Sequence, residues 1–321
     1  MIKIVYTGEM DTRPFKTVIG DTVKRLLDER EDIVYLDADL MSCSGTGACR
    51  KAHPDRAINV GIAEANMMGI AAGLAASGFK PIVHSFGPFA SRRSYDQVFL
   101  AAGYGRNDIT VIGTDPGVCA TFNGGTHMPF EDVALYRALP GATVIDITDT
   151  AMLEDVLPKL VDRKGVKYIR VGRKLNAKVY EEGSSFTVGK AVTLREGKDL
   201  TIVAAGIMVH EALKAAKALE KQGIEAEVLD MFTIKPLDEE ALLKSARKTG
   251  AVLACENHNK IGGLYAACCE ALCAHCPVPA ACVAVEDEFG EVGPQDYLQQ
   301  RFGLTAEHVE QAAKALIARK K

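Results

Sequence analysis

Short apolar runs alternate with longer amphipathic stretches along the first half of the chain, which has 321 residues. Each apolar run has the length of a buried strand, and each amphipathic stretch has the period of a helix. The runs predict strands at 32–40, 56–61, 80–86, 109–115, 142–148 and 166–172, and the stretches predict helices at 13–30, 61–78, 91–103, 131–138 and 149–163. Because apolar strands separated by helices are typical of parallel sheets, we expect an α/β domain with helices on both faces of its sheet.

The alternation loosens after residue 174 and then starts again. The polar stretch "AKVYEEGSSFTVGKAV" at 177–192, which contains Gly and Ser, is the candidate linker. A second series of runs predicts strands at 199–206, 224–231, 250–256 and 281–287, helices at 207–222 and 238–248, and a terminal helix N-capped by Thr305. We therefore predict two domains, 1–180 and a smaller α/β domain at 190–321, joined by a linker at 181–189.

Composition and charge argue against several classes of function. The chain is 48% hydrophobic and 25% charged, its formal net charge is −4, and its Lys and Arg residues do not form a basic block. A nucleic-acid-binding surface is therefore not expected. The amino-terminal stretch lacks the apolar core of a secretion signal, and no apolar run reaches the ~18 residues of a membrane span. We expect a cytoplasmic protein with no membrane partner.

The chain has nine cysteines, a high number for a protein with enough apolar residues to fold without disulfides. Five of them gather in one segment: Cys268, Cys269, Cys273, Cys276 and Cys282. Cys273 and Cys276 form a C-x-x-C pair that, with Cys282, is able to ligate zinc or an iron–sulfur cluster. Alternatively, Cys269, Cys273 and Cys276 share one helical face as small packing residues. The sequence has no second C-x-x-C pair at metal-site spacing, which favours packing.

One carboxylate stands out in the predicted helix 61–78, "GIAEANMMGIAAGLAASG". Glu64 lies in the first turn, where the helix dipole stabilises an acid by ~0.3–1 kcal/mol. The helix nevertheless has almost no polar face, and a carboxylate buried without a donor costs several kcal/mol. Glu64 therefore needs a hydrogen-bond donor, and the apolar composition around it suggests a donor from outside the chain.

Polar residues beyond the carboxyl ends of the predicted strands are candidates for a binding site, because open parallel sheets bind ligands there. Phe86 and Phe89 follow a strand in "HSFGPFASRR", with Arg92 and Arg93 close by, and form either an aromatic wall or a plug between sheet and helix. The loop "GTDPGVCATFNGGTHMPFED" at 113–132 is too long for a simple connector. It contains His127; a lone His is more often structural than catalytic, but its place in this loop favours proton transfer near neutral pH.

Two arginines are candidates for gripping an anion. Arg170 lies in the predicted strand 166–172, near its end, and Arg13 stands at the start of the first predicted helix. A guanidinium binds a phosphate or another anion through paired N–H donors. Either arginine alone is also a common surface residue.

Taken in order, these segments resemble one family. "GIAEANMMGIAAGLAASGFKPIVHSF" is similar to the pyrimidine-binding domain of thiamine diphosphate enzymes, and "GGTHMPFEDVALYRALPGATVIDITD" resembles the corresponding segment of transketolase. "GGL", "FGEVG" and "RFGLT" within residues 262–304 resemble the carboxy-terminal domain of the same family. The resemblance implies a thiamine diphosphate-dependent transketolase, in which a pyrimidine-binding domain is followed by a smaller α/β domain.

The resemblance also implies roles for the candidate residues. Glu64 would hydrogen-bond a ring nitrogen of the cofactor's aminopyrimidine and so activate the cofactor, and His127 would be a polar or acid–base group near the reacting centre. The implied cofactor-binding residues are Phe86, Phe89, Arg92 and Asp39, and the implied substrate-binding residues are Arg13, Arg170, Asp115 and Asn123. The implied reaction is transfer of a two-carbon ketol unit from a ketose to an aldose, either of which can be a sugar phosphate.

The family's motif for holding the diphosphate and its metal, Gly-Asp-Gly followed by an Asn, is absent from the sequence. Its absence implies the carboxy-terminal subunit of a split transketolase, whose amino-terminal partner subunit would hold the diphosphate and Mg²⁺ or Ca²⁺. Homodimerisation through both domains would give an α₂β₂ complex. Asp115 stands where transketolases have a His and Asn123 where they have an Asp, so the sequence supports the reaction class but does not identify the sugars, and the usual pentose phosphates do not follow from the resemblance.

Two other functions compete with ketol transfer. The β subunit of a 2-oxoacid dehydrogenase decarboxylase shares the domain pair and also lacks the Gly-Asp-Gly motif. The "GGTHMPFED" loop and Arg170 favour transketolase, because a 2-oxoacid substrate needs no grip on a sugar phosphate. A non-catalytic redox or scaffold protein on the same fold would give the cysteine cluster a purpose, and analysis for iron or zinc distinguishes it.

Overall fold

The computed structural model describes residues 1–320, which form two compact units. The first unit contains Met1–Pro116 and Leu135–Phe186. The second contains Gly117–Ala134 and the chain from Thr187 onward. The chain therefore passes into the second unit within the segment expected to be the linker. The long loop after residue 116, which the sequence placed in the first domain, belongs to the second unit.

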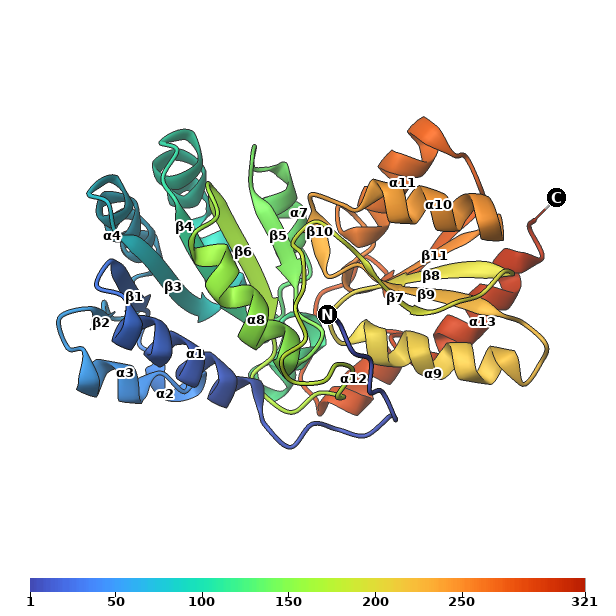
Figure 1. Cartoon of the computed structure of the whole chain (residues 1–321), viewed down its shortest axis with the longest axis horizontal. Coiled ribbons are helices and arrows are strands. Elements are labelled where there is room, and N and C mark those ends of the chain that lie inside the picture. Colours follow the sequence, from blue (N-terminus) through green and yellow to red (C-terminus); the bar gives the residue numbers. More distant parts are fainter. Residues whose placement is uncertain (321) are drawn as a thin grey trace. The chain divides into compact units, whose positions relative to one another are not determined.

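A parallel sheet forms the centre of the first unit. Its strands are β1 (Ile33–Asp37), β2 (Ala57–Asn59), β3 (Lys80–Phe86), β4 (Ile109–Thr114), β5 (Thr143–Asp146) and β6 (Val166–Val171). Within this unit they run in the order β5-β6-β4-β3-β1-β2, and every pairing is parallel (Figure 1). All residues of β1, β4, β5 and β6 are buried, as expected when both faces of a sheet are covered. The predicted α/β fold is confirmed.

Helices cover both faces of this sheet. They are α1 (Phe15–Glu29), α2 (Met41–Ser44), α3 (Gly47–Ala52), α4 (Glu64–Ala76), α5 (Gly87–Ala90), η1 (Arg92–Ser94), α6 (Tyr95–Gln97), the π-helix η2 (Val98–Tyr104) and α8 (Thr150–Val161). The β2-α4-β3 and β5-α8-β6 connections run in opposite directions along the sheet, so right-handed crossovers place α4 and α8 on opposite faces. α8 packs against α1, and α4 packs against η2.

The first unit differs from the predicted pattern in two places. The helix predicted at 91–103 is divided into η1, α6 and η2, because Ser94 leaves helical geometry at φ −116° and ψ 13° and because the helix continues as a π-helix from Val98. The helices α2 and α3 were not predicted, since their segment is short and lacks a clear apolar period. They are joined by a turn at Gly45, which has a φ of 79° and lies against Gly20 of α1, where a side chain on either glycine would clash with backbone.

The second unit contains a five-stranded sheet in the order β12-β11-β8-β9-β7. Its strands are β7 (Val192–Arg195), β8 (Leu200–Ala204), β9 (Ala226–Asp230), β11 (Val252–Asn259) and β12 (Ala280–Val285), and β10 (Thr233–Lys235) is a further short strand of the unit. β7 pairs antiparallel with β9, while the other pairs are parallel. The sequence did not predict β7, because only one of its four residues is buried.

The helices of the second unit are α9 (Met208–Glu220), α10 (Glu239–Thr249), α11 (Leu264–His275), α12 (Gln295–Arg301) and α13 (Ala306–Ile317). Four of these helices were predicted, the cysteine-bearing helix α11 among them, whereas α12 was not. Thr305 stands at the predicted N-cap position of α13, but its hydroxyl pairs with His308 Nδ1 at 2.9 Å and makes no capping bond to the backbone. Within residues 1–320, none of the helices has both the length and the apolar character needed to cross a membrane.

Candidate functional site

Glu64 is the first residue of α4, and its side chain is 3% exposed. Ser85 Oγ, near the end of β3, donates a hydrogen bond to Glu64 Oε1 at 3.3 Å. Arg93 Nη1 lies 3.0 Å from each oxygen of the Glu64 carboxylate. Both donors come from the same chain, and the expectation of a donor from outside it stays a prediction. The sequence could not reveal this contact, because Arg93 reaches Glu64 from the turn beyond β3.

Two phenylalanines lie beside this carboxylate, at the end of β3 and in α5. The centroids of the Phe86 and Phe89 rings are 6.3 Å apart, with an angle of 59° between the ring planes. The Arg93 guanidinium carbon lies 3.7 Å from the centroid of Phe89, which is the geometry of a cation–π contact. The structure thus gathers an acid, two aromatic rings and an arginine at the carboxyl end of β3.

The arginine in this cluster is not the one selected from the sequence. Arg92 is exposed in η1, whereas its neighbour Arg93 contacts both Glu64 and Phe89. Arg92 as a cofactor-binding residue stays a prediction. Adjacent residues of a short 3₁₀-helix point in different directions, and sequence alone does not decide which of them faces the acid.

A second charged pair adjoins the same aromatic rings. Arg173 Nε donates to Asp115 Oδ2 at 2.8 Å, and Arg173 Nη2 contacts the same oxygen. The Arg173 guanidinium carbon lies 4.8 Å from the centroid of Phe86. Burial lowers the pKa of Arg173, but the hydrogen bond and the charge of Asp115 outweigh it, so the pKa is raised above its usual value. The pair therefore keeps a fixed cation beside Phe86.

Asp115 is strained as well as buried. Its φ is 58°, in the left-handed region that few residues other than glycine, asparagine and aspartate adopt, and it is 2% exposed. Within residues 1–320, its buried Oδ1 atom has no hydrogen-bond partner. A strained residue with one unused acceptor is a common feature of functional sites. Its contact with a substrate stays a prediction.

Asp39 lies just beyond the end of β1 and is exposed. It also has a left-handed conformation, with a φ of 64°. Its amide donates to Asn59 Oδ1 at 3.0 Å, and Asn59 Nδ2 donates to Asp39 Oδ1 at 2.8 Å. This reciprocal pair fixes Asp39 at the carboxyl edge of the sheet, where the resemblance places a lining residue of the cofactor pocket.

A buried polar network, which the sequence did not reveal, supports the strand ends beneath the site. His84 Nδ1 lies 2.7 Å from Asp37 Oδ2, and His84 Nε2 lies 3.1 Å from Thr114 Oγ1. Tyr35 donates to Asp37 Oδ2 at 2.9 Å, and burial raises the pKa of Tyr35 well above its ordinary value. These contacts join β1, β3 and β4 side by side and hold the ends of these strands in register.

The two arginines predicted to grip an anion have different surroundings. Arg13 is partly exposed, and its Nη2 lies 3.3 Å from Glu154 Oε2 and 3.2 Å from Glu182 Oε1. Arg170 is 1% exposed, and its Nη1 lies 2.8 Å from Asp146 Oδ2 on the neighbouring strand β5. Arg170 therefore takes part in a buried ion pair between β5 and β6, and substrate binding by either arginine stays a prediction.

His127 and Asn123 lie in the loop that belongs to the second unit. Asn123 ends the 3₁₀-helix η3 (Gly117–Asn123), and His127 ends the 3₁₀-helix η4 (Gly125–His127). Thr126 Oγ1 and His127 Nδ1 are 2.9 Å apart, so the threonine orients the imidazole. Acid–base work by His127 stays a prediction.

This loop is anchored within its own unit, just before α7 (Asp132–Ala138). Val118 N donates to Asn257 Oδ1 at 3.0 Å. A side chain at Gly125 would clash with the backbone of Gly290, so the loop packs closely against that segment. These contacts link positions far apart in the chain, which explains why no local pattern of the sequence places the loop in the second unit.

Two family domains match the chain in the order predicted from its sequence. Residues 11–178 match the domain described as "Transketolase, pyrimidine binding domain". Residues 189–309 match the domain described as "Transketolase, C-terminal domain". The chain belongs to the transketolase family. Transketolases are thiamine diphosphate-dependent transferases, so this chain is a subunit of such an enzyme.

Several curated transketolase relatives match along most of the chain. The "6-deoxy-6-sulfo-D-fructose transketolase subunit SqwH" of Clostridium sp. (strain MSTE9) is 52% identical over 90% of this chain and 89% of its own length. A relative from Phocaeicola vulgatus, named as one subunit of an apulose-4-phosphate transketolase, is 37% identical over 90% of this chain and 93% of its own length. Human transketolase is 34% identical over 94% of this chain but only 48% of its own length. The chain thus matches subunits of split transketolases nearly end to end.

A solved structure gives the same result. The protein described as "Split gene transketolase, inactive beta4 tetramer" superposes with a TM-score of 0.89 at 39% sequence identity. The superposition covers 96% of this chain and 99% of the other. The hypothesis of a split transketolase is confirmed, and the β subunit of a 2-oxoacid decarboxylase is not favoured.

The five clustered cysteines lie in or next to α11 and β12, whereas Cys43 hydrogen-bonds Arg173 of the site described above. All nine cysteines are free, and within residues 1–320 no group of three or more His, Cys, Asp and Glu side chains is placed to hold a metal ion. Cys268 is buried in α11, whereas Cys273 is exposed, so the packing interpretation does not hold for Cys273. Burial raises the pKa of the Cys282 thiol to about 12, which makes it a poor nucleophile.

Proposed function

We propose that this chain is the carboxy-terminal subunit of a two-chain transketolase, which transfers a two-carbon ketol unit between sugars with thiamine diphosphate activated by Glu64. The observation that carries the proposal is the cluster of Glu64, Phe86 and Phe89 at the carboxyl end of β3, joined through Ser85 and Arg93. A buried carboxylate beside two aromatic rings is what a flat ring with a protonatable nitrogen requires.

The groups present fit the aminopyrimidine of thiamine diphosphate. Glu64 is buried, so its carboxylate forms a strong hydrogen bond with any donor that reaches it. The phenylalanine rings offer apolar faces against which a heteroaromatic ring stacks. The cluster also lies at the edge of the sheet where α/β proteins bind their ligands.

Each residue has a distinct task in this proposal. When bound, thiamine diphosphate supplies the nucleophilic carbon that attacks the carbonyl of the donor sugar. Glu64 holds a proton at the ring nitrogen of the aminopyrimidine, while Phe86 and Phe89 orient the ring and exclude water from it. His127 exchanges protons with the hydroxyl groups of the sugars, because an imidazole titrates near neutral pH.

A partner subunit supplies the half of the site that binds the diphosphate and the metal. The sequence of this chain lacks the Gly-Asp-Gly motif. The relative from Clostridium sp. is named as a subunit, and the 36% identical relative from Methanocaldococcus jannaschii is named "Putative transketolase C-terminal section". In the proposed α₂β₂ complex, an amino-terminal subunit holds Mg²⁺ or Ca²⁺ together with the diphosphate.

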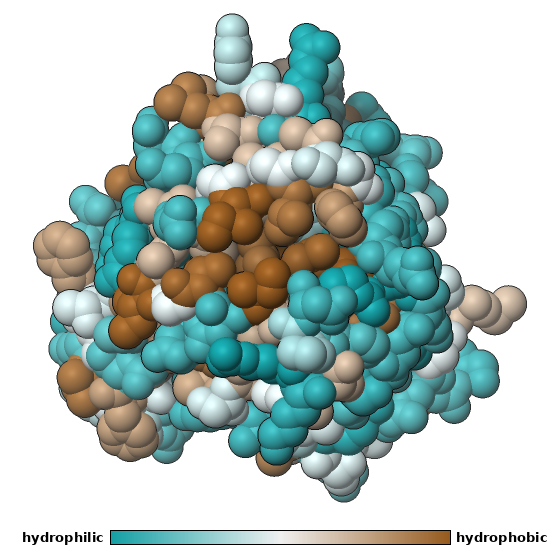
Figure 2. Space-filling model, turned by 90° about the vertical axis from the view of Figure 1, so that its left-hand side faces the viewer, coloured by the Kyte–Doolittle hydropathy of each residue, from teal (hydrophilic) through white to brown (hydrophobic). Residues whose placement is uncertain are grey.

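An apolar face of the first unit supports such a partner. Figure 2 shows apolar side chains gathered on the side of the molecule that carries α4. The exposed apolar residues of α4, of η2 and of the segment before α4 include Ile62, Ile70, Phe99, Leu100 and Tyr104. Leu100 is 54% exposed and Tyr104 83% exposed. Contiguous apolar surface of this kind marks protein–protein interfaces.

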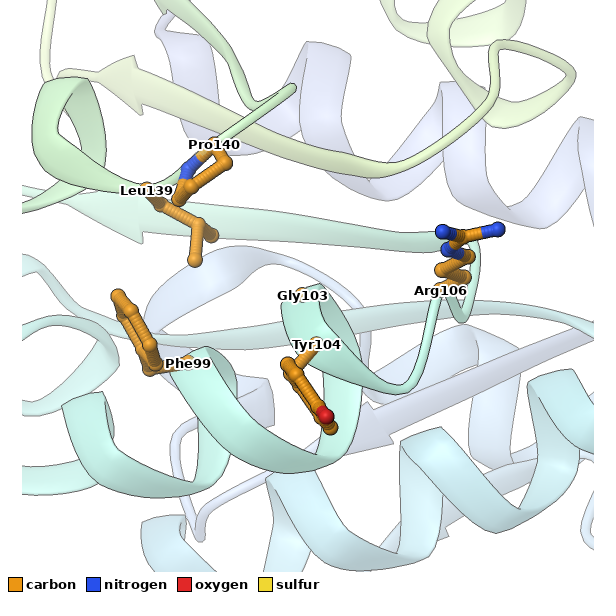
Figure 3. Close-up of a pocket in the computed structure, with 6 residues that line it drawn as sticks. All are labelled: Phe99, Gly103, Tyr104, Arg106, Leu139 and Pro140. Carbon is orange, nitrogen blue, oxygen red and sulfur yellow. The ribbon is translucent and has the colours of Figure 1, made fainter.

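A pocket of about 490 Å³ adjoins η2 (Figure 3). Figure 3 shows the rings of Phe99 and Tyr104 and the side chain of Leu139 facing the same space. The residues that line the pocket are Phe99, Gly103, Tyr104, Arg106, Leu139 and Pro140. A pocket with two aromatic walls is suited to an apolar anchor residue from a second chain.

The comparisons suggest a first donor sugar. Among the relatives named above, the one named for 6-deoxy-6-sulfo-D-fructose shares 52% identity, against 37% for the one named for apulose-4-phosphate. We therefore propose 6-deoxy-6-sulfo-D-fructose as the donor and an aldose phosphate as the acceptor. A sulfonate and a phosphate are both anions that arginine binds through paired N–H donors, and Arg173 lies beside Phe86.

The decisive experiment uses the chain purified together with its partner subunit and supplied with thiamine diphosphate and Mg²⁺. Glyceraldehyde 3-phosphate is the acceptor, and 6-deoxy-6-sulfo-D-fructose is compared with fructose 6-phosphate, which carries a phosphate in place of the sulfonate. Mass spectrometry should detect a ketose phosphate longer than the acceptor by two carbons. The second product is an aldose sulfonate shorter than the donor by two carbons.

Two results would contradict parts of this proposal. A complex that binds thiamine diphosphate but transfers no ketol unit from either donor would contradict the reaction. Transfer from fructose 6-phosphate alone would contradict the sulfonated substrate and leave the reaction class intact.

A further inference from the structure

We propose that Arg93 occupies the aminopyrimidine subsite when the chain is alone and must leave it before thiamine diphosphate binds. This inference rests on the proposed function, because it takes Glu64 and Phe89 as groups that hold the aminopyrimidine. It adds to the site a competitor that belongs to the chain itself. Arg93 then determines how readily the cofactor enters.

Arg93 contacts the two kinds of group that an aminopyrimidine would contact. Its Nη1 lies 3.0 Å from both oxygens of Glu64. Its guanidinium carbon lies 3.7 Å from the centroid of the Phe89 ring. At this distance the two flat groups are in van der Waals contact, so no second ring fits between them. Arg93 in this position and an aminopyrimidine on the same face of Phe89 exclude each other.

A guanidinium resembles a protonated aminopyrimidine in its recognition chemistry. Both groups are flat and delocalised, and both present N–H donors in their own plane. Each can hydrogen-bond a carboxylate at its edge while stacking its face on an aromatic ring. The buried carboxylate of Glu64 needs a donor whenever the cofactor is absent, and Arg93 supplies one. Arg93 thus stabilises the empty site.

The position of Arg93 allows it to move without unfolding its surroundings. Its side chain is 45% exposed, whereas that of Glu64 is 3% exposed. It belongs to η1, a three-residue 3₁₀-helix between α5 and α6. When Arg93 turns outward, Ser85 still donates to Glu64 from β3. The competitor is therefore mobile, while the acid and its second donor are fixed.

The experiment uses the full-length chain without its partner. The probe is 4-amino-5-hydroxymethyl-2-methylpyrimidine, the ring portion of the cofactor alone, and its binding is followed by calorimetry or ligand-observed NMR. We expect Arg93→Ala to bind the probe about tenfold more tightly than the wild type, because the ion pair and the cation–π contact no longer compete. The affinity of Arg93→Lys for the probe should lie between those of the wild type and Arg93→Ala, since lysine keeps the charge but cannot stack a planar group on Phe89.

Two further variants test whether the gain in affinity for the probe depends on Glu64 and Arg93. Arg25→Ala removes an exposed arginine from α1 and should bind the probe as the wild type does. The double variant Glu64→Ala with Arg93→Ala should not show the gain in affinity for the probe, because it also lacks the carboxylate that the probe needs. Thermal melting confirms that each variant is folded.

The outcomes separate this inference from the proposed function. Equal affinity of the wild type and Arg93→Ala, with loss of binding in Glu64→Ala, would overturn the role of Arg93 and leave the cofactor site standing. If none of the variants, nor the wild type, bound the probe, both the inference and the assignment of the cluster to the aminopyrimidine would be overturned.

Discussion

The carboxylate of Glu64 accepts hydrogen bonds from two donors that differ in their freedom to move. Ser85 belongs to β3 and is buried, whereas Arg93 extends from a short turn and is half-exposed. A ligand that binds Glu64 therefore displaces Arg93 and leaves Ser85 in place. The same acid is thus satisfied in the empty site and in the filled one, with only one of its donors exchanged.

Replacing Glu64 with glutamine should abolish turnover and leave the fold intact. The glutamine side chain would keep the size of the original and its contact with Ser85, but it could not hold a proton at the cofactor's ring nitrogen. We expect Glu64→Gln to lower kcat of the reconstituted complex by about 100-fold or more, the usual loss for an acid–base group. The control is Glu29→Gln, which changes an exposed acid of α1. Activity above a tenth of wild type, with normal melting and normal assembly, would contradict the role of Glu64.

Single residues also show what sequence reasoning can and cannot find. Glu64 could be selected because an acid in an apolar helix needs a donor. Arg93 could be placed beside Phe86 and Phe89, but its contact with Glu64, 29 residues away, arises only through the fold. Arg170 was selected for its place near the end of a strand, but the structure pairs it with Asp146. Arg173, three residues further, is the arginine beside Phe86, and only the path of the chain after β6 reveals this.

At the scale of elements, Arg30 joins the carboxyl-terminal ends of α1 and α8. It follows the last residue of α1, and its Nη1 lies 2.8 Å from Oδ2 of Asp162, which follows α8. Its Nε also donates to Asp32 Oδ1 at 2.9 Å. Hydrogen bonding to Arg30 lowers the pKa of Asp162 below its ordinary value of 3.8. The ion pair therefore makes the packing of the two helices depend on pH.

Asp162→Asn should destabilise the chain slightly at pH 7 and by less at pH 3. Both partners are partly exposed, so after screening by solvent we expect a loss of about 0.5 kcal/mol in the free energy of unfolding at pH 7. A carboxyl whose folded-state pKa is depressed contributes stability above its unfolded pKa and loses it as the pH falls through the folded-state pKa. Urea unfolding at both pH values measures the difference, with Asp55→Asn as an exposed control. If the free energies of unfolding of the wild type and Asp162→Asn differed as much at pH 3 as at pH 7, the role of the charge would be contradicted.

Long periodic helices and buried apolar strands could be predicted from the sequence, whereas the short helices α2 and α3 and the partly exposed strand β7 could not. α1, α4, α8 and α9 have at least three turns and a clear apolar pattern or composition, so the sequence located them. α2, α3 and β7 have four to six residues each, too few for a period to appear. The loop of η3 and η4 follows a strand of the first unit in sequence but is anchored to β11 through Asn257, a long-range contact that no local pattern encodes.

At the scale of the whole molecule, α4 is one element that the lone chain leaves incompletely covered. Gly69 and Gly73 of this helix are exposed, and a Cβ atom built on either one has no atom within 4 Å. Glycine weakens a helix interior, so its presence at two exposed positions is a cost to the lone chain. Close approach of another chain to α4 would explain why no larger residue stands there.

Gly69→Ala and Gly73→Ala should therefore have opposite effects on the lone chain and on the complex. Each should raise the stability of the lone chain by about 0.5–1 kcal/mol, because alanine is the better helix former. Each should also weaken assembly, since the added methyl group separates the packed surfaces. Thermal melting measures the first effect and analytical ultracentrifugation the second. Gly47→Ala in α3 is the control, because a Cβ atom at Gly47 also has no atom within 4 Å. If all three variants assembled with the partner equally well, a partner on α4 would be contradicted.

Thiamine diphosphate should bind the complex at least about 100-fold more tightly than it binds this chain alone. The aminopyrimidine ring and the diphosphate belong to one molecule, so binding of one end to this chain strengthens binding of the other end to the partner subunit. The lone chain offers the ring only Glu64 and the two phenylalanines, and Arg93 competes for these groups. The diphosphate end needs Mg²⁺ and the motif that this sequence lacks.

Calorimetry of the chain, the partner and their complex, each with Mg²⁺ and with EDTA, measures the difference in affinity for thiamine diphosphate. EDTA should weaken binding to the complex and leave binding to the lone chain unchanged, because only the diphosphate end depends on the metal. Tight, metal-dependent binding by the lone chain would place the diphosphate site on this polypeptide and contradict the split.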